Sequence, residues 1–307
     1  MGPTASGKTA LALALAERLP RAIGCGPVEV VSADARQVYR LMDIATAKPT
    51  QAERAQVLHH VVDMVWPDQS YTLAQYQADA QGAIAAIQAR NGLPLLVGGS
   101  GLYVRAVMDG LAIPVVEPRD ELRAELEALA ARSGAEALVQ RLRTTDPLSA
   151  QRIDPRNVRR LIRAIEVSEV TGIPFSAQQG RRPTPYATPL ILGLTTRRES
   201  LYGRADLRIN RMLAEGLIAE TRALLDRGYS ASLPSMSSLG YREIGAYLRG
   251  EASLEDARAR FEFATHAYIR RQLTWFRPDT RIAWLDCAEP PERLADAAIR
   301  LIAAALV

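Results

Sequence analysis

The chain has 307 residues, 48% of them hydrophobic, which is enough for one large domain or for one domain with an insertion. No apolar run approaches the roughly 18 residues that a membrane span requires, and we expect no signal peptide. Cys25 and Cys287 lack metal-ligand spacing, which indicates free thiols in a reducing compartment. We therefore expect a soluble, cytoplasmic protein with no membrane partner.

The net charge is +4, and lysine is rare among the 38 basic residues. Lys8 and Lys48 are the two lysines in a chain that otherwise uses arginine. At Lys8, phosphate chemistry requires a compact ammonium group. The same pattern marks Lys48 as a second residue of interest.

A phosphate-binding loop stands at the start of the chain. Residues 2–9 read Gly-Pro-Thr-Ala-Ser-Gly-Lys-Thr and match G-x-x-x-x-G-K-[ST], a pattern shared with ATP-binding proteins. A helical run over residues 10–18 follows, so backbone N–H groups and the helix N-terminus are expected to face a polyphosphate or pyrophosphate. The Thr9 hydroxyl is the expected Mg²⁺ ligand. The expected diphosphate-binding residues of the loop are Gly2, Thr4, Ala5, Ser6, Gly7, Lys8 and Thr9.

The strand that normally precedes such a loop is not evident. A strand needs about five or six residues, and only Met1 stands before Gly2. We expect that the first strand of the sheet is missing because the true start lies upstream. The alternative is that another segment takes its place.

The next strand is predicted over residues 28–32, which are β-branched and apolar, and Asp34 follows it. Ligands of open α/β sheets bind at the carboxyl ends of the strands, so Asp34 is expected on the rim that carries the phosphate loop. Its carboxylate could cap the next helix, hold Mg²⁺ or act as a general base. The adjacent His59 and His60 point to opposite faces of an extended segment, which argues against a histidine metal site.

A helix is predicted over residues 71–90 and a parallel strand over residues 93–97, followed by Gly98, Gly99 and Ser100. Many phosphate-loop hydrolases end a strand near this position in an aspartate that orders Mg²⁺ and water. The glycines instead let a substrate approach the backbone, and Ser100 offers a hydroxyl. This pattern favours a diphosphate bound beside a second substrate over nucleotide hydrolysis.

Strand signals vanish over residues 114–186, which predicts a helical insertion into a core made of residues 1–113 and 187–307. The insertion contains arginines spaced i, i+3, i+4 and i+7, namely Arg156, Arg159, Arg160 and Arg163. An apolar set lies on the opposite face of the same helix, so the arginines are predicted to face outward and to contact RNA phosphate. A merely solvated surface is the alternative.

Sequence blocks along the whole chain resemble one family. They are the phosphate loop, Ser-Ala-Asp-Ala-Arg-Gln-Val-Tyr at 32–39, Ala-Thr-Ala-Lys-Pro-Thr at 45–50, His-His-Val-Val-Asp at 59–63, Val-Gly-Gly-Ser-Gly-Leu-Tyr at 97–103, Leu-Gly-Tyr-Arg-Glu at 239–243 and Arg-Arg-Gln-Leu-Thr-Trp-Phe-Arg at 270–277. In this order they resemble the bacterial tRNA dimethylallyltransferases (isopentenyltransferases) from Gly2 to Trp284.

The resemblance implies a phosphate-loop NTPase-like α/β fold, with a parallel sheet flanked by helices and a helical insertion that binds tRNA. It also implies transfer of a dimethylallyl group from dimethylallyl diphosphate to the exocyclic amine of the adenosine 3′ of the tRNA anticodon, with release of pyrophosphate. Mg²⁺ is the implied cofactor and the anticodon stem-loop the implied RNA partner. We expect a monomer.

The same resemblance assigns roles to single residues. Asp34 matches the general base, and Ser100 matches a position, usually threonine, that contacts the reacting adenosine. Arg204 and Arg208 match arginines that reach the diphosphate. The implied tRNA contacts are Asp34, Ala35, Arg36, Gln37, Ser100, Arg123, Arg159, Arg160, Leu161, Ile162, Arg163, Ser237, Ser238, Leu239, Gly240, Tyr241 and Arg242.

Two other classes of protein share parts of this pattern. A nucleoside-monophosphate-type kinase has the same loop, sheet and helical insertion, but the glycine-rich strand end at Gly98 argues against it. A tRNA-binding protein with a dead transferase site is the second, and the intact Lys8, Thr9, Asp34 and Ser100 count against it. Trp275, beside a basic cluster, could stack on a base or belong to the core.

Overall fold

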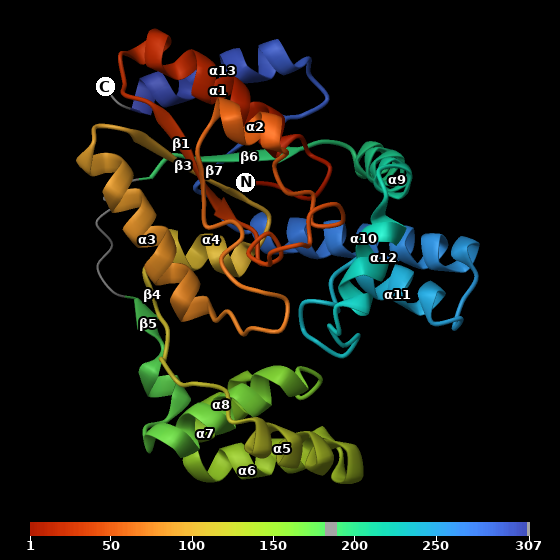
Figure 1. Cartoon of the computed structure of the whole chain (residues 1–307). Helices are drawn as coiled ribbons and strands as arrows, with labels where there is room; N and C mark the ends of the chain where they lie inside the picture. The colour runs from red at the N-terminus through yellow and green to blue at the C-terminus, as the bar shows by residue number, and fades with distance from the viewer. Residues whose placement is uncertain (182–188, 306–307) are drawn as a thin grey trace. The chain divides into compact units, whose positions relative to one another are not determined.

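The computed structural model describes residues 1–181 and 189–305. The chain divides into two compact units, one made of Met1–Val107 with Tyr186–Val307 and the other of Met108–Pro185 (Figure 1). The predicted insertion begins at residue 114 rather than 108 and ends at 186 rather than 185. Among the described residues, no helix is long and apolar enough to cross a membrane.

Two groups of parallel strands form the centre of the larger unit. β1 (Val28–Ala33) lies between β2 (His59–His60) and β3 (Leu93–Gly98), while β6 (Ile191–Thr195) pairs with β7 (Ile282–Asp286). Every residue of β1 is buried, and its one charged side chain, Glu29, is paired with His60 and Arg90. Because Ala33 of β1 is in register with Gly98 of β3, the residues that follow these strands meet at one edge of the sheet. The predicted parallel α/β arrangement is confirmed.

The phosphate loop begins directly beside β6. The Met1 nitrogen donates to the Leu192 carbonyl over 2.6 Å, and the Leu194 N–H donates to the Met1 carbonyl over 2.8 Å. A Cβ atom at Gly2 would lie 2.6 Å from the Leu194 carbonyl oxygen, so glycine is required for this close approach. The strand expected ahead of Gly2 stays a prediction.

Helices cover the strands of this unit, with α1 and α13 on one side and α3 and α4 on the other (Figure 1). The core on the side of α1 and α13 includes Leu15, Leu194, Leu201 and Ile269. The helices of this unit are α1 (Lys8–Ile23), α2 (Gln51–Gln56), α3 (Leu73–Ala89), α4 (Gly101–Met108), α9 (Arg198–Ala214), α10 (Leu217–Asp226), α11 (Tyr241–Leu248), α12 (Leu254–Phe276) and α13 (Pro291–Ala305).

The smaller unit is helical, as its sequence predicts. A short antiparallel pair, β4 (Leu111–Ala112) with β5 (Gly180–Arg181), joins the two ends of this unit. Its helices are α5 (Asp120–Ser133), α6 (Ala135–Thr145), α7 (Pro147–Arg152), α8 (Val158–Thr171) and the 3-10 helix η1 (Phe175–Gln178). The side chains of Leu161 and Ile162 on α8 are buried in the core of this unit, so they cannot reach RNA in this conformation.

A buried carboxylate organises this helical unit. Glu166 of α8 is fully buried and accepts hydrogen bonds from both the Nε and Nη2 atoms of Arg123, at 2.7 and 2.8 Å, and from the Arg119 N–H at 2.8 Å. Arg163 donates to the same carboxylate over 2.7 Å, and also to the carbonyls of Val116 and Pro114.

The prediction of one outward arginine stripe is therefore wrong for Arg163. Arg163 and Arg123 hold the Glu166 carboxylate, and Arg156 is paired with Asp154 over 2.7 Å. Arg159 and Arg160 are exposed. Arg156, Arg159 and Arg160 therefore face solvent as predicted, and of these Arg156 is paired with Asp154.

Replacing Glu166 with glutamine should destabilise the helical unit by about 2–4 kcal/mol. Loss of a buried ion-pair partner costs roughly 3–5 kcal/mol, and we discount this because about a third of each arginine side chain, Arg123 and Arg163, is exposed. Glu169→Gln on the same helix is the matched control, since its partner Arg141 is similarly exposed but Glu169 itself is not buried. That control should cost about 0–1 kcal/mol. Amide hydrogen exchange across α5 and α8 measures the loss of stability in both variants. An equal loss in the two would contradict the structural role of Glu166.

The same carboxylate predicts a dependence of stability on pH. Burial acts to raise the pKa of Glu166, but the hydrogen bonds from Arg123, the Arg119 N–H and Arg163 outweigh it, so the pKa lies below its usual range. The stabilisation is therefore fully present above the unfolded pKa of about 4.3 and is lost as the pH falls through the lower folded value. The Glu166→Gln variant should lack this acid-induced loss in α5 and α8, as measured by amide hydrogen exchange at several pH values.

Candidate active site

The phosphate loop curls tightly before α1. Ala5 and Gly7 have left-handed backbone conformations, with φ of 62° and 82°, and Gly7 caps α1 without a side-chain hydrogen bond. The N-terminal N–H groups of α1 therefore receive no acceptor from the cap side chain. The buried Ser6 hydroxyl also has no hydrogen-bond partner among the described residues. Unsatisfied donors of this kind suit a bound phosphate.

Two cations lie at this loop. Burial, followed by the nearby charge of Arg208, lowers the pKa of Lys8 to about 8, while Asp34 opposes that shift. The Lys8 ammonium donates to the Pro3 carbonyl over 2.7 Å. Burial also lowers the pKa of Arg208, again with Asp34 opposing it. The electrostatics thus place Lys8, Arg208 and Asp34 close enough to influence one another.

A cavity of about 1160 Å³ brings the predicted residues together. Its wall includes Lys8 and Thr9 of the loop, Arg204 and Arg208 of α9, and Asp34 beyond β1. Arg204 also donates to the Cys287 carbonyl over 3.0 Å. Spacing of four residues places the two arginines one turn apart on the same face of α9.

The ends of β1 and β3 are joined at the rim of this cavity. The Arg36 N–H donates to Asp34 Oδ1 over 2.8 Å, and the Ala35 N–H donates to Ser100 Oγ over 3.0 Å. Residues 34–37 form a turn rather than a helix start, so the helix-cap alternative for Asp34 is wrong. A turn of this kind fixes the carboxylate at the cavity wall, where the general-base and metal roles stay open.

Tyr268 of α12 is a site residue that the sequence patterns did not predict. Its side chain lines the cavity, close enough to Asp34 and Ser100 for both to act on its pKa. Burial, together with the charge of Asp34, raises its pKa to about 12, so the phenol stays protonated at neutral pH. One sequence feature could have identified Tyr268. It lies four residues, about one helical turn, before Gln272, which belongs to the arginine-rich block at 270–277.

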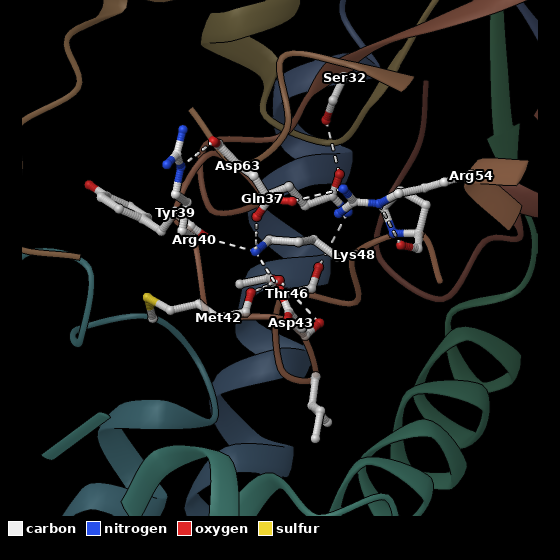
Figure 2. Close-up of polar contacts among 12 residues, drawn as sticks. Ser32, Gln37, Tyr39, Arg40, Met42, Asp43, Thr46, Lys48, Arg54 and Asp63 are labelled. Carbon is white, nitrogen blue, oxygen red and sulfur yellow. Dashed lines mark hydrogen bonds and ion pairs between the residues drawn. The ribbon is translucent and has the colours of Figure 1, made fainter. Parts of the chain in front are cut away.

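Lys48 has a structural role in the wall of the cavity (Figure 2). Its side chain is 2% exposed, and the ammonium donates to the Tyr39 carbonyl, to Asp43 Oδ1 and to Asp63 Oδ1 at 2.5–2.6 Å. Arg54 pairs with the second oxygen of Asp63 over 2.8 Å. These bonds close the long loop between β1 and β2 on itself.

Gln37 extends the same loop network (Figure 2). Its Oε1 accepts from the Ser32 hydroxyl over 2.9 Å, and its Nε2 donates to the Ala47 carbonyl over 3.0 Å. The Gln37 side chain also lines the cavity. Its proposed contact with tRNA would therefore be made by a side chain whose amide is already fixed within the loop.

One predicted tRNA-contact segment is hydrogen-bonded to residues that lead into another. Arg36 donates to the Pro234 carbonyl over 2.8 Å, which joins residues 34–37 to the segment that leads into α11. In that segment Ser237 and Arg242 are exposed, and Leu239 is half-buried.

Other members of that segment face inward. Ser238 is buried and donates to the Ser235 carbonyl, while Gly240 packs against Ala45 and Phe261. Tyr241 is buried, and its hydroxyl donates to Glu220 Oε1 over 2.5 Å. The side chains of Ser238 and Tyr241 therefore support the segment rather than present a surface.

Comparisons with known proteins agree with the motifs. The sequence profile of the IPP transferases matches residues 37–279. A relative from Roseiflexus castenholzii, named tRNA dimethylallyltransferase, is 52% identical over 98% of this chain and 96% of its own length. A relative of the same name from Chloroflexus aurantiacus is 50% identical over 90% of this chain and 91% of its own length.

The fold has a solved counterpart. The full-length tRNA isopentenylpyrophosphate transferase from Bacillus halodurans superposes with a TM-score of 0.71 at 38% identity, covering 99% of this chain and 94% of that one. The expected resemblance is confirmed by sequence and by structure alike, over nearly the whole length of both chains. The chain belongs to the IPP transferase family.

Proposed function

We propose that this protein transfers a dimethylallyl group from dimethylallyl diphosphate to the exocyclic amine of the adenosine 3′ of the anticodon in tRNA. The observation that carries the proposal is one cavity with two chemically different walls. One wall has the phosphate loop with Lys8 and Arg208, and the other has Asp34. Ser100 is not among the residues that line the cavity, but its Oγ accepts a hydrogen bond from the Ala35 N–H next to Asp34. Family membership supplies the reaction class, and the two walls supply places for a donor and an acceptor.

The reaction forms a C–N bond and breaks a C–O bond. The adenosine amine attacks the allylic carbon, the C–O electron pair leaves with pyrophosphate, and a proton leaves the amine. Lys8, Arg208 and the loop N–H groups would stabilise the developing charge on pyrophosphate. Asp34 would accept the proton, and Ser100 with Tyr268 would orient the base. Because an adenine amine is a weak nucleophile, positioning must supply much of the acceleration.

The loop also fits Mg²⁺. No cluster of acidic, histidine or cysteine side chains in the described part of the chain could hold a metal by itself, so diphosphate oxygens would supply most ligands, with Thr9 at the cavity wall. When bound, Mg²⁺ would neutralise charge on the leaving pyrophosphate. The expected monomeric state and cytoplasmic location stay predictions.

A product assay tests the proposed reaction. The protein is incubated with dimethylallyl diphosphate, Mg²⁺ and unmodified tRNA, and the digested nucleosides are analysed by mass spectrometry. A dimethylallyl adduct on the adenosine 3′ of the anticodon is the expected result. An unmodified adenosine would contradict the transferase function, and turnover of ATP without tRNA would favour a kinase instead.

Replacing Asp34 with asparagine should lower kcat by about 10²–10⁴-fold, because the amide cannot accept the amine proton. Binding of tRNA and of magnesium pyrophosphate should change little, since size and turn geometry are kept. Asp68→Asn is the control, because this exposed carboxylate lies outside the cavity wall. A kcat for Asp34→Asn within a few-fold of the parent, in single-turnover assays, would mean that Asp34 only orients groups.

Replacing Arg159 or Arg160 with glutamine should weaken the binding of different tRNAs alike. The slope of log affinity against log salt should shrink by roughly 0.7–0.9 for each RNA phosphate that the variant no longer neutralises. Arg132→Gln is the control, because Arg132 is an exposed arginine at the end of a different helix, α5. This variant should leave the slope of log affinity against log salt unchanged. Filter-binding titrations at several salt concentrations measure the slopes. Unchanged slopes for both α8 variants would mean that this surface is only solvated.

A further inference from the structure

One amide side chain connects the two walls of the cavity. Gln272 of α12 is 5% exposed, and its Oε1 accepts from the Thr4 N–H over 2.8 Å. Its Nε2 donates to the Gly99 carbonyl, also over 2.8 Å. A backbone N–H only donates and a carbonyl only accepts, so the orientation of this amide is fixed by its partners.

The glycines after β3 allow α12 to approach. A Cβ atom at Gly99 would lie 2.3 Å from Gln272 Nε2, and one at Gly101 would lie 2.0 Å from Cδ1 of Trp275. α12 therefore packs directly on backbone at this strand end. Trp275 is 46% exposed with its ring against Gly101, so it is not a core residue, and its stacking on a base stays a prediction.

The two partners of Gln272 belong to the sites of different substrates. Thr4 is in the phosphate loop, which would hold the diphosphate, and Gly99 adjoins Ser100, which would face the acceptor adenosine. One turn earlier on the same helix, Tyr268 lines the same cavity, close enough to Ser100 for Ser100 to act on its pKa. α12 thus contacts the donor side and the acceptor side through side chains four residues apart.

We propose that Gln272 is a positioning residue that sets the separation between the donor loop and the acceptor strand end. This inference rests on the proposed transferase function. The loop remains anchored without Gln272, because Met1 is hydrogen-bonded to β6. Loss of the amide should therefore shift the loop rather than unfold it, and a shift of about 1 Å at reacting groups can cost on the order of 10²-fold in rate.

Gln272→Met keeps the side-chain length and removes both hydrogen bonds. In steady-state assays its kcat should fall about 10–100-fold, while the KM for tRNA changes less than about threefold. Gly99→Ala disturbs the same contact from the other side and should lower kcat comparably. In a Gln272→Ala background, where the shorter side chain leaves room for the added methyl group, Gly99→Ala should cost less than about threefold more, because the amide that it displaces is gone.

Thr265→Val is the matched control on the same helix, since the Thr265 hydroxyl is buried without a partner in the described residues. Its kcat should equal that of the parent. A kcat for Gln272→Met within about threefold of the parent would overturn the proposal. So would a Gly99→Ala change that lowers kcat by the same factor whether or not Gln272 is present. If Gln272→Met does not fold, the Gly99→Ala variant tests the positioning role by itself. A lower kcat with a nearly unchanged KM for tRNA would support that role, and an unchanged kcat would contradict it.

Amide hydrogen exchange of the peptide containing Thr4 gives a readout besides activity. Exchange at Thr4 should accelerate in Gln272→Met and stay unchanged in Thr265→Val. If the parent transfers no dimethylallyl group, the proposed function fails while this exchange result still tests the hydrogen bond. If the parent is active and Thr4 exchange does not change, the positioning role fails by itself.

Discussion

The structure depends on positive charge held at a curled loop. Lys8 and Arg208 come from α1 and α9, and burial lowers the pKa of both side chains. Two like charges held together favour a bound anion, and the charge of Asp34 acts on both of these half-buried side chains. The loop that carries Lys8 is fixed at two points, by the pairing of Met1 with β6 and by the Gln272 amide. An anion that enters the cavity therefore meets donors that are already in place.

The acceptor side is rigid for a different reason. β1 and β3 end in register, so Asp34 and Ser100 are brought to one edge, and the Ala35 N–H binds the Ser100 hydroxyl directly. Lys48 closes the neighbouring loop by satisfying three oxygen acceptors with one buried ammonium. Catalysis that relies on positioning requires such rigidity, because a mobile site does not hold the reacting atoms in the geometry that the reaction needs.

Local patterns predicted the loop, the strands β1 and β3 and the rim position of Asp34, because each is encoded within a few adjacent residues. The contacts of Gln272 could not be predicted in the same way, since Thr4 is 268 residues away in the chain. Periodicity also failed at Arg163. It placed the side chain on the outward stripe of α8, but a buried acid three residues later, Glu166, draws it inward. Composition does not reveal that a glutamate is buried.

The most direct test of the proposed transferase site is a crystal structure with magnesium pyrophosphate and an unmodified anticodon stem-loop. We predict pyrophosphate at Lys8 and Arg208, with the amine of the adenosine 3′ of the anticodon in the same cavity. That amine should lie within about 2.6–3.2 Å of the Asp34 carboxylate. Pyrophosphate in the loop with the adenosine outside the cavity, or an amine that contacts another residue while Asp34 points away, would contradict the proposed site.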